Sequence, residues 1–316
     1  MKTQVETRRL RTWEADAGYV PQRAWRVIMK YGYLRMARTW FLATLGIGIV
    51  ITEVLLLAGL SRSMVSATTA PDPGTILATV FFFLAVAVVA LILVGAPLFA
   101  DDLRFNAPLF YFSRPLRPDD YLRGKAMQMV SLLAALALLP TLALMVLGML
   151  LGSTAGTPTD FAGNPLAGDA LAAYNATHLT GFADWLYATA VVGAGVAVVL
   201  AFGIAVTLCA SAYTRRGWHA GLAAFGFLGA WSVIGAMAKF GAKGAYESLF
   251  GPFGWIGLVL ERPMTMRFHS SSPNPADAVP EGSGFAVAIA YGLLLATTLM
   301  LLGATVRRIR RVEAIL

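Results

Sequence analysis

Residues 76–99 read ILATVFFFLAVAVVALILVGAPLF, and this run contains no acidic or basic side chain. A helix needs about 20 apolar residues to cross the hydrocarbon core of a bilayer, where no water is present to satisfy its backbone. Five further runs of this kind cover residues 40–60, 126–151, 185–213, 218–238 and 284–304. Glu53 is the one acidic or basic residue inside any of the six. The sequence therefore predicts an all-α polytopic membrane protein with six transmembrane helices.

The composition supports this class and excludes others. The 316 residues are 58% hydrophobic and 13% charged, with a mean hydropathy of +0.68, whereas soluble domains carry about 25% charged residues. A soluble enzyme, a soluble binding module and a disordered chain are excluded. A single cysteine, Cys209, excludes an intramolecular disulfide framework. Residues 1–39 carry nine basic side chains before the first run, so we expect that run to remain as a helix and not to be a cleaved signal peptide.

The basic residues predict the orientation in the membrane. Twenty of the 25 Lys and Arg residues lie in the two termini and in segments 100–125 and 213–217, and five lie in the alternate segments. The positive-inside rule therefore places both termini in the cytoplasm. The net charge of +8 is explained by these flanking residues, so nucleic acid is not expected as a partner.

Residues 1–39 form a cytoplasmic segment ahead of the six-span domain, 40–316. Within it, Arg23, Arg26 and Lys30 repeat at helical spacing, while Trp25 falls on another side. This pattern predicts an amphipathic interfacial helix lying on the inner leaflet. The alternative is an ordinary basic flank that only orients the first span.

Two loops face the opposite side in this topology. Residues 152–184 contain Gly, Pro, Thr and Asp without Lys or Arg, which indicates an irregular connection. Residues 239–283 include an apolar stretch at 254–260, too short to span, which predicts re-entrant or interfacial helices. Glycines in the fourth and fifth runs predict close helix contacts: Gly193, Gly195, Gly221, Gly226 and Gly229.

The loop between the second and third runs holds the most specific pattern. Residues 97–125 read PLFADDLRFNAPLFYFSRPLRPDDYLRGK. An aromatic and Leu-rich section precedes a rigid turn around Pro115 and Pro118, and Asp119 is a candidate cap for the next helix. A short helix between stiff turns suits docking into a cleft of another protein.

This loop resembles the first cytoplasmic loop of ABC-2 type transporter permeases, which carries an acid, a Ser-Arg-Pro turn and a Gly-Lys before the third helix. The architecture of six spans with an amphipathic N-terminal helix is similar too. The resemblance implies a coupling helix near residues 101–111 that contacts a separate ATPase subunit. The residues implied in coupling are Asp101, Asp102, Arg104, Leu109, Phe110, Tyr111, Ser113, Arg114, Pro115, Gly124 and Lys125. Asn106-Ala107-Pro108 stands where the family often has Gly and Thr.

The chain lacks the G-x-x-x-x-G-K-[ST] loop that holds ATP phosphates, because Gly124-Lys125 is followed by Ala126. We therefore expect no enzyme activity in this chain, and ATP with Mg²⁺ in the partner ATPase. The resemblance implies an exporter in a bacterial cytoplasmic membrane, with a second permease copy or a homologous permease completing the dimer. An extracytoplasmic partner is a candidate for the long outer loops.

The residues leave two other functions open. An ATP-independent secondary transporter needs paired charges inside the membrane, and only Glu53 lies there. Glu53 is a candidate for the translocation path, or it packs against a neighbouring hydroxyl. An ABC-linked anchor for an extracytoplasmic partner is the second alternative. His178, His219 and His269 lie in three separate segments, so no metal site and no catalytic residue is expected.

Overall fold

A computed structural model describes most of the predicted membrane domain. The described residues are 26, 28–30, 48, 73–104, 118–152, 165–179, 181–214, 216–238, 252–268 and 283–315. Within these ranges the chain is helical and contains no β-strand, which confirms the all-α class.

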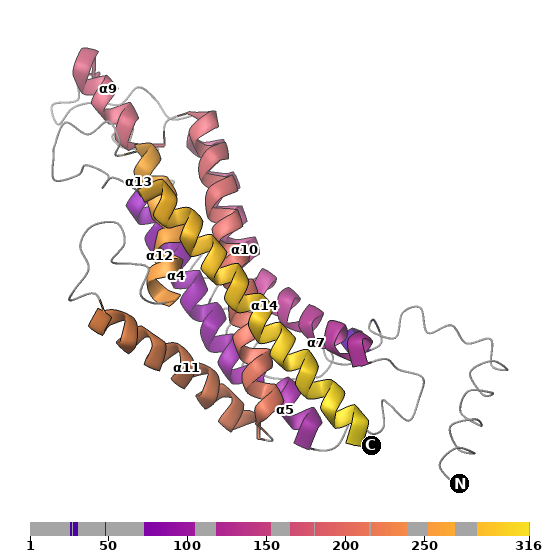
Figure 1. Ribbon diagram of the computed structural model, residues 1–316. Helices are drawn as coiled ribbons and strands as arrows, with labels where there is room; N and C mark the ends of the chain where they lie inside the picture. Colours follow the sequence, from indigo (N-terminus) through magenta and orange to yellow (C-terminus); the bar gives the residue numbers. More distant parts are fainter. Residues whose placement is uncertain are drawn as a thin grey trace, which may run out of the picture.

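The helices form an elongated bundle (Figure 1). Two continuous helical rods each consist of two α-helices joined by one π-helical turn. The first rod consists of α4 (Pro73–Ala90), η1 (Leu91–Gly95) and α5 (Ala96–Arg104), and the second of α7 (Pro118–Leu133), η2 (Ala134–Leu138) and α8 (Leu139–Gly152). The other helices are α9 (Gly168–Thr177), α10 (Phe182–Tyr213), α11 (Gly217–Ala238), α12 (Pro252–Leu260), α13 (Arg262–Phe268) and α14 (Ser283–Ile315).

Four of the described helices are long and apolar enough to cross a membrane. They cover Ile76–Asp102, Asp120–Leu150, Phe182–Tyr213 and Gly284–Ile309, and they contain the predicted runs 76–99, 185–213 and 284–304 with nearly all of 126–151. The chain is thus a membrane protein. The predicted span 218–238 coincides with α11, which is not among these four, and span 40–60 lies outside the described residues except for Gly48. The count of six spans stays a prediction.

The two π turns share a feature that the apolar pattern did not indicate. Each ends two residues before a proline, Pro97 or Pro140. Proline has no N–H and its ring clashes with the carbonyl one turn earlier, so a regular α-helix cannot continue unchanged through it. Immediately before each proline the backbone pairs over the wider π spacing, with Ala96 N–H donating to Leu91 O and Leu139 N–H donating to Ala134 O. The π turns therefore accommodate the prolines without ending the helices.

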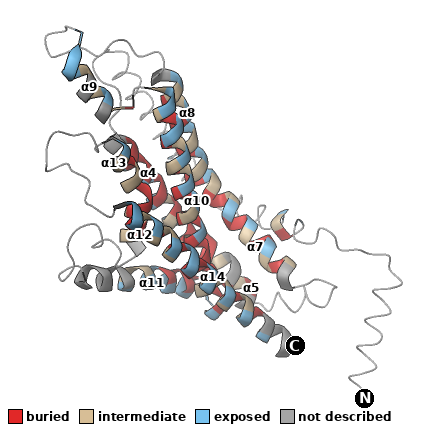
Figure 2. Ribbon diagram, turned by 45° about the horizontal axis from the view of Figure 1, so that its top comes forward, coloured by how far each residue is buried: buried red, intermediate tan, exposed pale blue. Residues whose placement is uncertain are grey.

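Helix α10 is the centre of the bundle and packs against α5, α8, α11, α12 and α14. Buried residues gather along α4 and α10 (Figure 2), while large apolar side chains such as Trp218, Phe225 and Leu299 are exposed on the outside. An apolar exterior of this extent is expected of helices that face lipid. One end of the bundle brings together the ends of α5, α10 and α14 and the starts of α7 and α11, and it is called the basic end below (Figure 1).

At the opposite end the structure corrects one prediction. The segment 152–184 was expected to be irregular, but it contains the ten-residue helix α9. Its sequence GDALAAYNAT is rich in Ala, the strongest helix former, and this propensity outweighs the Gly and Pro residues around it. The loop expectation is wrong for these residues.

The apolar stretch 254–260 is helical, as predicted. It belongs to α12, which packs against α10 and α14, and α13 follows directly. Two polar contacts hold α13 to the start of α10. Arg267 Nη2 lies 3.2 Å from Asp184 Oδ1, and the Tyr187 hydroxyl donates to the Pro263 carbonyl at 3.1 Å.

Helices α5 and α11 approach each other closely through small residues. Ala96, Ala100 and Ala220 form a buried cluster between them. A Cβ atom added to Gly221 would lie 2.9 Å from the Ile92 carbonyl oxygen, and one added to Gly217 would lie 2.7 Å from Pro97 Cβ. Because these positions have no room for a side chain, the backbones of α11 and of the first rod are in direct contact.

The predicted glycine contacts are confirmed only in part. A Cβ on Gly195 would lie 2.7 Å from Leu260, and Gly221 is equally tight. Gly193 has ordinary van der Waals spacing to Leu142. Gly226 and Gly229 have no neighbour within 4 Å in the part of the chain that the structure describes.

Gly221 and Gly226 make a matched pair for testing this packing. Gly221→Ala places a methyl group against the Ile92 carbonyl, so we expect it to lower the free energy of unfolding by about 1–3 kcal/mol. Gly226→Ala should be neutral or stabilise by up to about 1 kcal/mol, because alanine favours the helix. Thermal unfolding of both purified variants in detergent measures the difference. Equal stabilities would contradict the α5–α11 contact.

Candidate functional site

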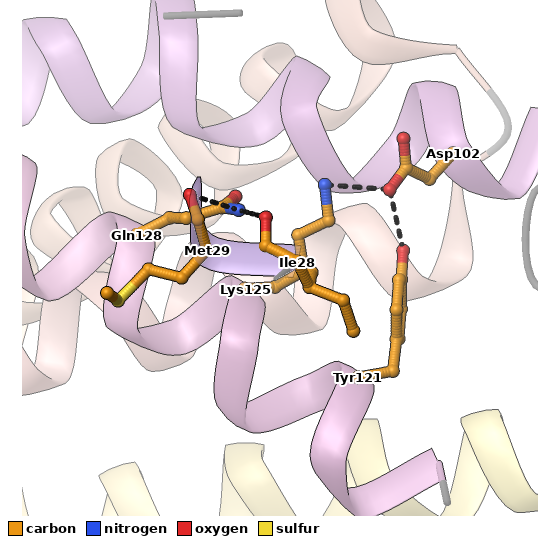
Figure 3. Close-up of polar contacts among 6 residues, drawn as sticks. All are labelled: Ile28, Met29, Asp102, Tyr121, Lys125 and Gln128. Atoms are coloured by element: carbon orange, nitrogen blue, oxygen red, sulfur yellow. Dashed lines mark hydrogen bonds and ion pairs between the residues drawn. The ribbon is translucent and has the colours of Figure 1, made fainter. Parts of the chain in front are cut away.

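A buried ion pair joins the two rods at the basic end. Lys125 Nζ of α7 lies 2.7 Å from Asp102 Oδ2 of α5. The same carboxylate oxygen accepts a hydrogen bond from the Tyr121 hydroxyl at 3.0 Å. Asp102 is 7% exposed, Lys125 5% and Tyr121 1%. Figure 3 shows Lys125 and Tyr121 converging on Asp102. The end of the span Ile76–Asp102 and the start of the span Asp120–Leu150 are therefore fastened to each other.

The spacing of the α7 residues produces this geometry. Tyr121 and Lys125 are four positions apart, so they lie on the same face of α7, one turn from each other. The Lys125 ammonium also lies 6.0 Å from the centre of the Tyr121 ring. Burying either charge alone is costly, whereas the pair with its added hydroxyl contact compensates much of that cost.

Gln128 extends the same face of α7 by one more turn and contacts the N-terminal segment. Its Nε2 donates to the Ile28 carbonyl at 2.6 Å and lies 3.4 Å from the Met29 carbonyl (Figure 3). Gln128 is fully buried and Ile28 nearly so. The Oε1 atom of Gln128 has no partner among the described residues. Tyr121, Lys125 and Gln128 thus connect α7 to two other segments, and with Asp102 and Ile28 they form what is called the junction cluster.

Helix α5 is also held on its other sides. The Ser211 hydroxyl of α10 donates to the Ala96 carbonyl at 3.1 Å, next to the π turn η1. A Cβ added to Gly217 of α11 would lie 3.1 Å from Asp101 Oδ1. A displacement of α5 would therefore disturb its contacts with α7, α10 and α11 together.

Some predicted coupling residues fall in this region. Asp101 and Asp102 lie in the last turn of α5, which Arg104 ends, and α5 is continuous with the second span. Gly124 and Lys125 are buried inside α7, which begins at Pro118, so the third helix starts about two turns before the predicted Gly-Lys opening.

Other predicted residues lie outside the described part of the chain. In the loop these are Leu109, Phe110, Tyr111, Ser113, Arg114 and Pro115, and elsewhere Arg23, Trp25 and Glu53. Arg26 and Lys30 are described, helical and exposed, flanking the buried Ile28. The amphipathic interfacial helix stays a prediction, because most of its residues lie outside the described part of the chain.

Tyr121 and Gln128 were missed as site residues. The signal was present, because Tyr121, Lys125 and Gln128 repeat at i, i+4 and i+7 along the start of an otherwise apolar helix. Polar groups at this spacing mark one face, and a polar face on a membrane helix needs a partner inside the protein.

The histidines do not gather. His178 stacks on the Tyr174 ring at 4.1 Å between centroids, His219 is exposed, and His269 is not described. Within the described ranges no three His, Cys, Asp or Glu side chains are placed to hold a metal ion.

Comparison with models of known protein families finds no match for this chain. Comparison with curated protein sequences finds none either.

The ion pair can be tested by unpairing it. Asp102→Asn removes the negative charge 2.7 Å from the buried Lys125 ammonium, so we expect a loss of about 3–5 kcal/mol in unfolding free energy. The double variant Asp102→Asn/Lys125→Met removes both charges and should recover most of that loss. Asp120→Asn, one residue before Tyr121, is the control and should change stability by less than about 0.5 kcal/mol. Chemical unfolding in detergent gives the values, and a double variant no more stable than Asp102→Asn would contradict the pairing.

Proposed function

We propose that this chain is the transmembrane permease subunit of an ATP-driven ABC-2 type exporter. In this proposal it lies in a bacterial cytoplasmic membrane with six spans and both termini inside. Two permease chains, identical or homologous, work with two copies of a separate ATPase subunit that binds ATP and Mg²⁺. The basic end of the bundle then faces the cytoplasm.

The junction cluster is the observation that carries the proposal. The resemblance assigns ATPase contact to residues 101–111. This segment begins in the last turn of α5, and α7 flanks the loop on its other side. Asp102 and Lys125 fasten these two flanks together, and Gln128 adds the N-terminal segment. A force applied to the loop therefore reaches three segments at once.

The packing of α5 supports transmission further into the membrane. From Ala96 to Asp102 this helix contacts α10 through Ser211 and α11 through Gly217. The π turn η1 directly before Ala96 is a place where the backbone departs from regular α pairing. A push on α5 would thus be passed to the spans that face it, which is what coupling to a cytoplasmic ATPase requires.

The proposal is tested by purifying the tagged chain from its native cells in mild detergent. We expect an ATPase subunit in equal amount and ATP hydrolysis sensitive to vanadate. A chain that purifies alone and supports no hydrolysis would contradict the proposal and favour a gradient-driven transporter, in which Glu53 becomes the residue to study.

In the same complex, Gln128→Leu should uncouple the ATPase. Losing one buried hydrogen bond of about 1 kcal/mol shifts the link to the N-terminal segment about fivefold, so the ATPase stimulation given by the permease should fall by a similar factor. Binding of the ATPase should persist. Ser131→Ala is the matched control, because the Ser131 hydroxyl donates to the Gln128 carbonyl of its own helix at 2.8 Å and to no other segment among the described residues. Unchanged stimulation in Gln128→Leu, or an equal fall in Ser131→Ala, would contradict the proposed role of the cluster.

A further inference from the structure

Two apolar spans end beside each other at the basic end. The tyrosine ring at the end of one span contacts an arginine side chain at the end of the other. Tyr213 is the last residue of the span Phe182–Tyr213, and Arg308 is the last residue but one of the span Gly284–Ile309. The Arg308 guanidinium carbon lies 5.8 Å from the centre of the Tyr213 ring. Tyr213 is 60% exposed, whereas Arg308 is half-buried. The ring therefore holds the cation in a fixed place near the surface.

Further positive charge surrounds this pair. Arg307 and Arg311 are exposed and one turn apart on α14, and the exposed Arg216 lies three residues after Tyr213. Within the part of the chain that the structure describes, none of these four arginines pairs with a carboxylate, and Arg308 Nε is buried without a hydrogen-bond partner. The guanidinium groups thus offer several N–H donors whose natural partner is an oxyanion.

The depth of the pair indicates the source of that anion. Tyr213 and Arg308 lie in the last turns of two segments that are long and apolar enough to cross a membrane. Residues at this position lie at the level of the lipid headgroups, where tyrosine and arginine are favoured. Phosphate oxygens of anionic phospholipids occupy the same level, and basic residues beside a span attract them.

We propose that Tyr213, Arg216, Arg307, Arg308 and Arg311 form a binding site for the phosphate of an anionic phospholipid in the leaflet at the basic end. Arg308, fixed by the Tyr213 ring, gives the site its geometry, and the three exposed arginines add charge. The site lies where the end of α10 packs against α14, and Arg216 stands directly before α11, so the lipid would bridge α10 and α14. This inference does not depend on the transport function proposed above.

The test measures lipid retention by the purified full chain in native mass spectrometry. Phosphatidylglycerol should bind more tightly than the zwitterionic phosphatidylcholine. Arg308→Gln should weaken phosphatidylglycerol binding about fivefold, the effect of one basic residue near the surface. Arg123→Gln, an exposed arginine near the start of α7, is the matched control and should leave retention unchanged.

A second pair of variants separates the site from general surface charge. Tyr213→Phe keeps the aromatic ring and should retain phosphatidylglycerol as the original chain does. Tyr213→Leu keeps every charge but removes the ring below Arg308, and we expect a loss of about two- to fivefold. These variants also keep the proposal testable if Arg308→Gln does not fold.

Three outcomes would overturn the proposal. The first is an equal loss in Arg308→Gln and Arg123→Gln, which indicates unspecific charge. The second is binding of inorganic phosphate alone with the same dependence on Arg308 and Tyr213, which assigns the site to a free ion. The third is unchanged lipid retention in Arg308→Gln together with loss of a co-purifying ATPase, which assigns these arginines to a protein contact.

Discussion

The basic end of this protein depends on one buried charge pair. Asp102 and Lys125 are both removed from solvent, so neither tolerates separation from the other without a large electrostatic cost. That constraint fixes the distance between the end of α5 and the start of α7. It also sets the rotation of α7 about its axis, which presents Tyr121 to Asp102 and Gln128 to Ile28.

Two prolines also shape the rods that the Asp102–Lys125 pair joins. Pro97 and Pro140 each lie two residues after a π turn, so each rod consists of two α-helical parts joined by a wider turn. In the first rod, the part after the π turn is α5, which carries Asp102. It is held by α7, α10 and α11 and not by α4 alone. Helix α5 is therefore held by polar and close backbone contacts with its neighbours as well as by its connection through the π turn.

The helices could be predicted from the sequence, because an apolar run of this length satisfies its backbone hydrogen bonds in a bilayer by forming a helix. The sequence also indicates a functional segment at residues 101–125, and the resemblance names Asp102 and Lys125 among its coupling residues. Their pairing was not predicted, since which side chains meet across two helices depends on rotation and depth, which hydropathy does not report. The helix α9 was missed because Gly and Pro residues around it obscured a short Ala-rich segment. The sequence contains Pro97 and Pro140, but residue types alone do not specify the backbone hydrogen bonds that form the π turn before each of them.

The central claim, contact between the segment 101–111 and an ATPase, is tested most directly by cross-linking. The chain has one cysteine, so a Cys209→Ser background gives a unique thiol after Phe110→Cys. Labelling this thiol with a benzophenone maleimide and irradiating the purified complex, which inserts the ketone into a nearby C–H bond without needing a second thiol, should join the Phe110→Cys variant to the ATPase subunit. Asn175→Cys, exposed on α9 at the opposite end of the bundle, should give no such product. No product from Phe110→Cys, or equal product from both positions, would contradict the account.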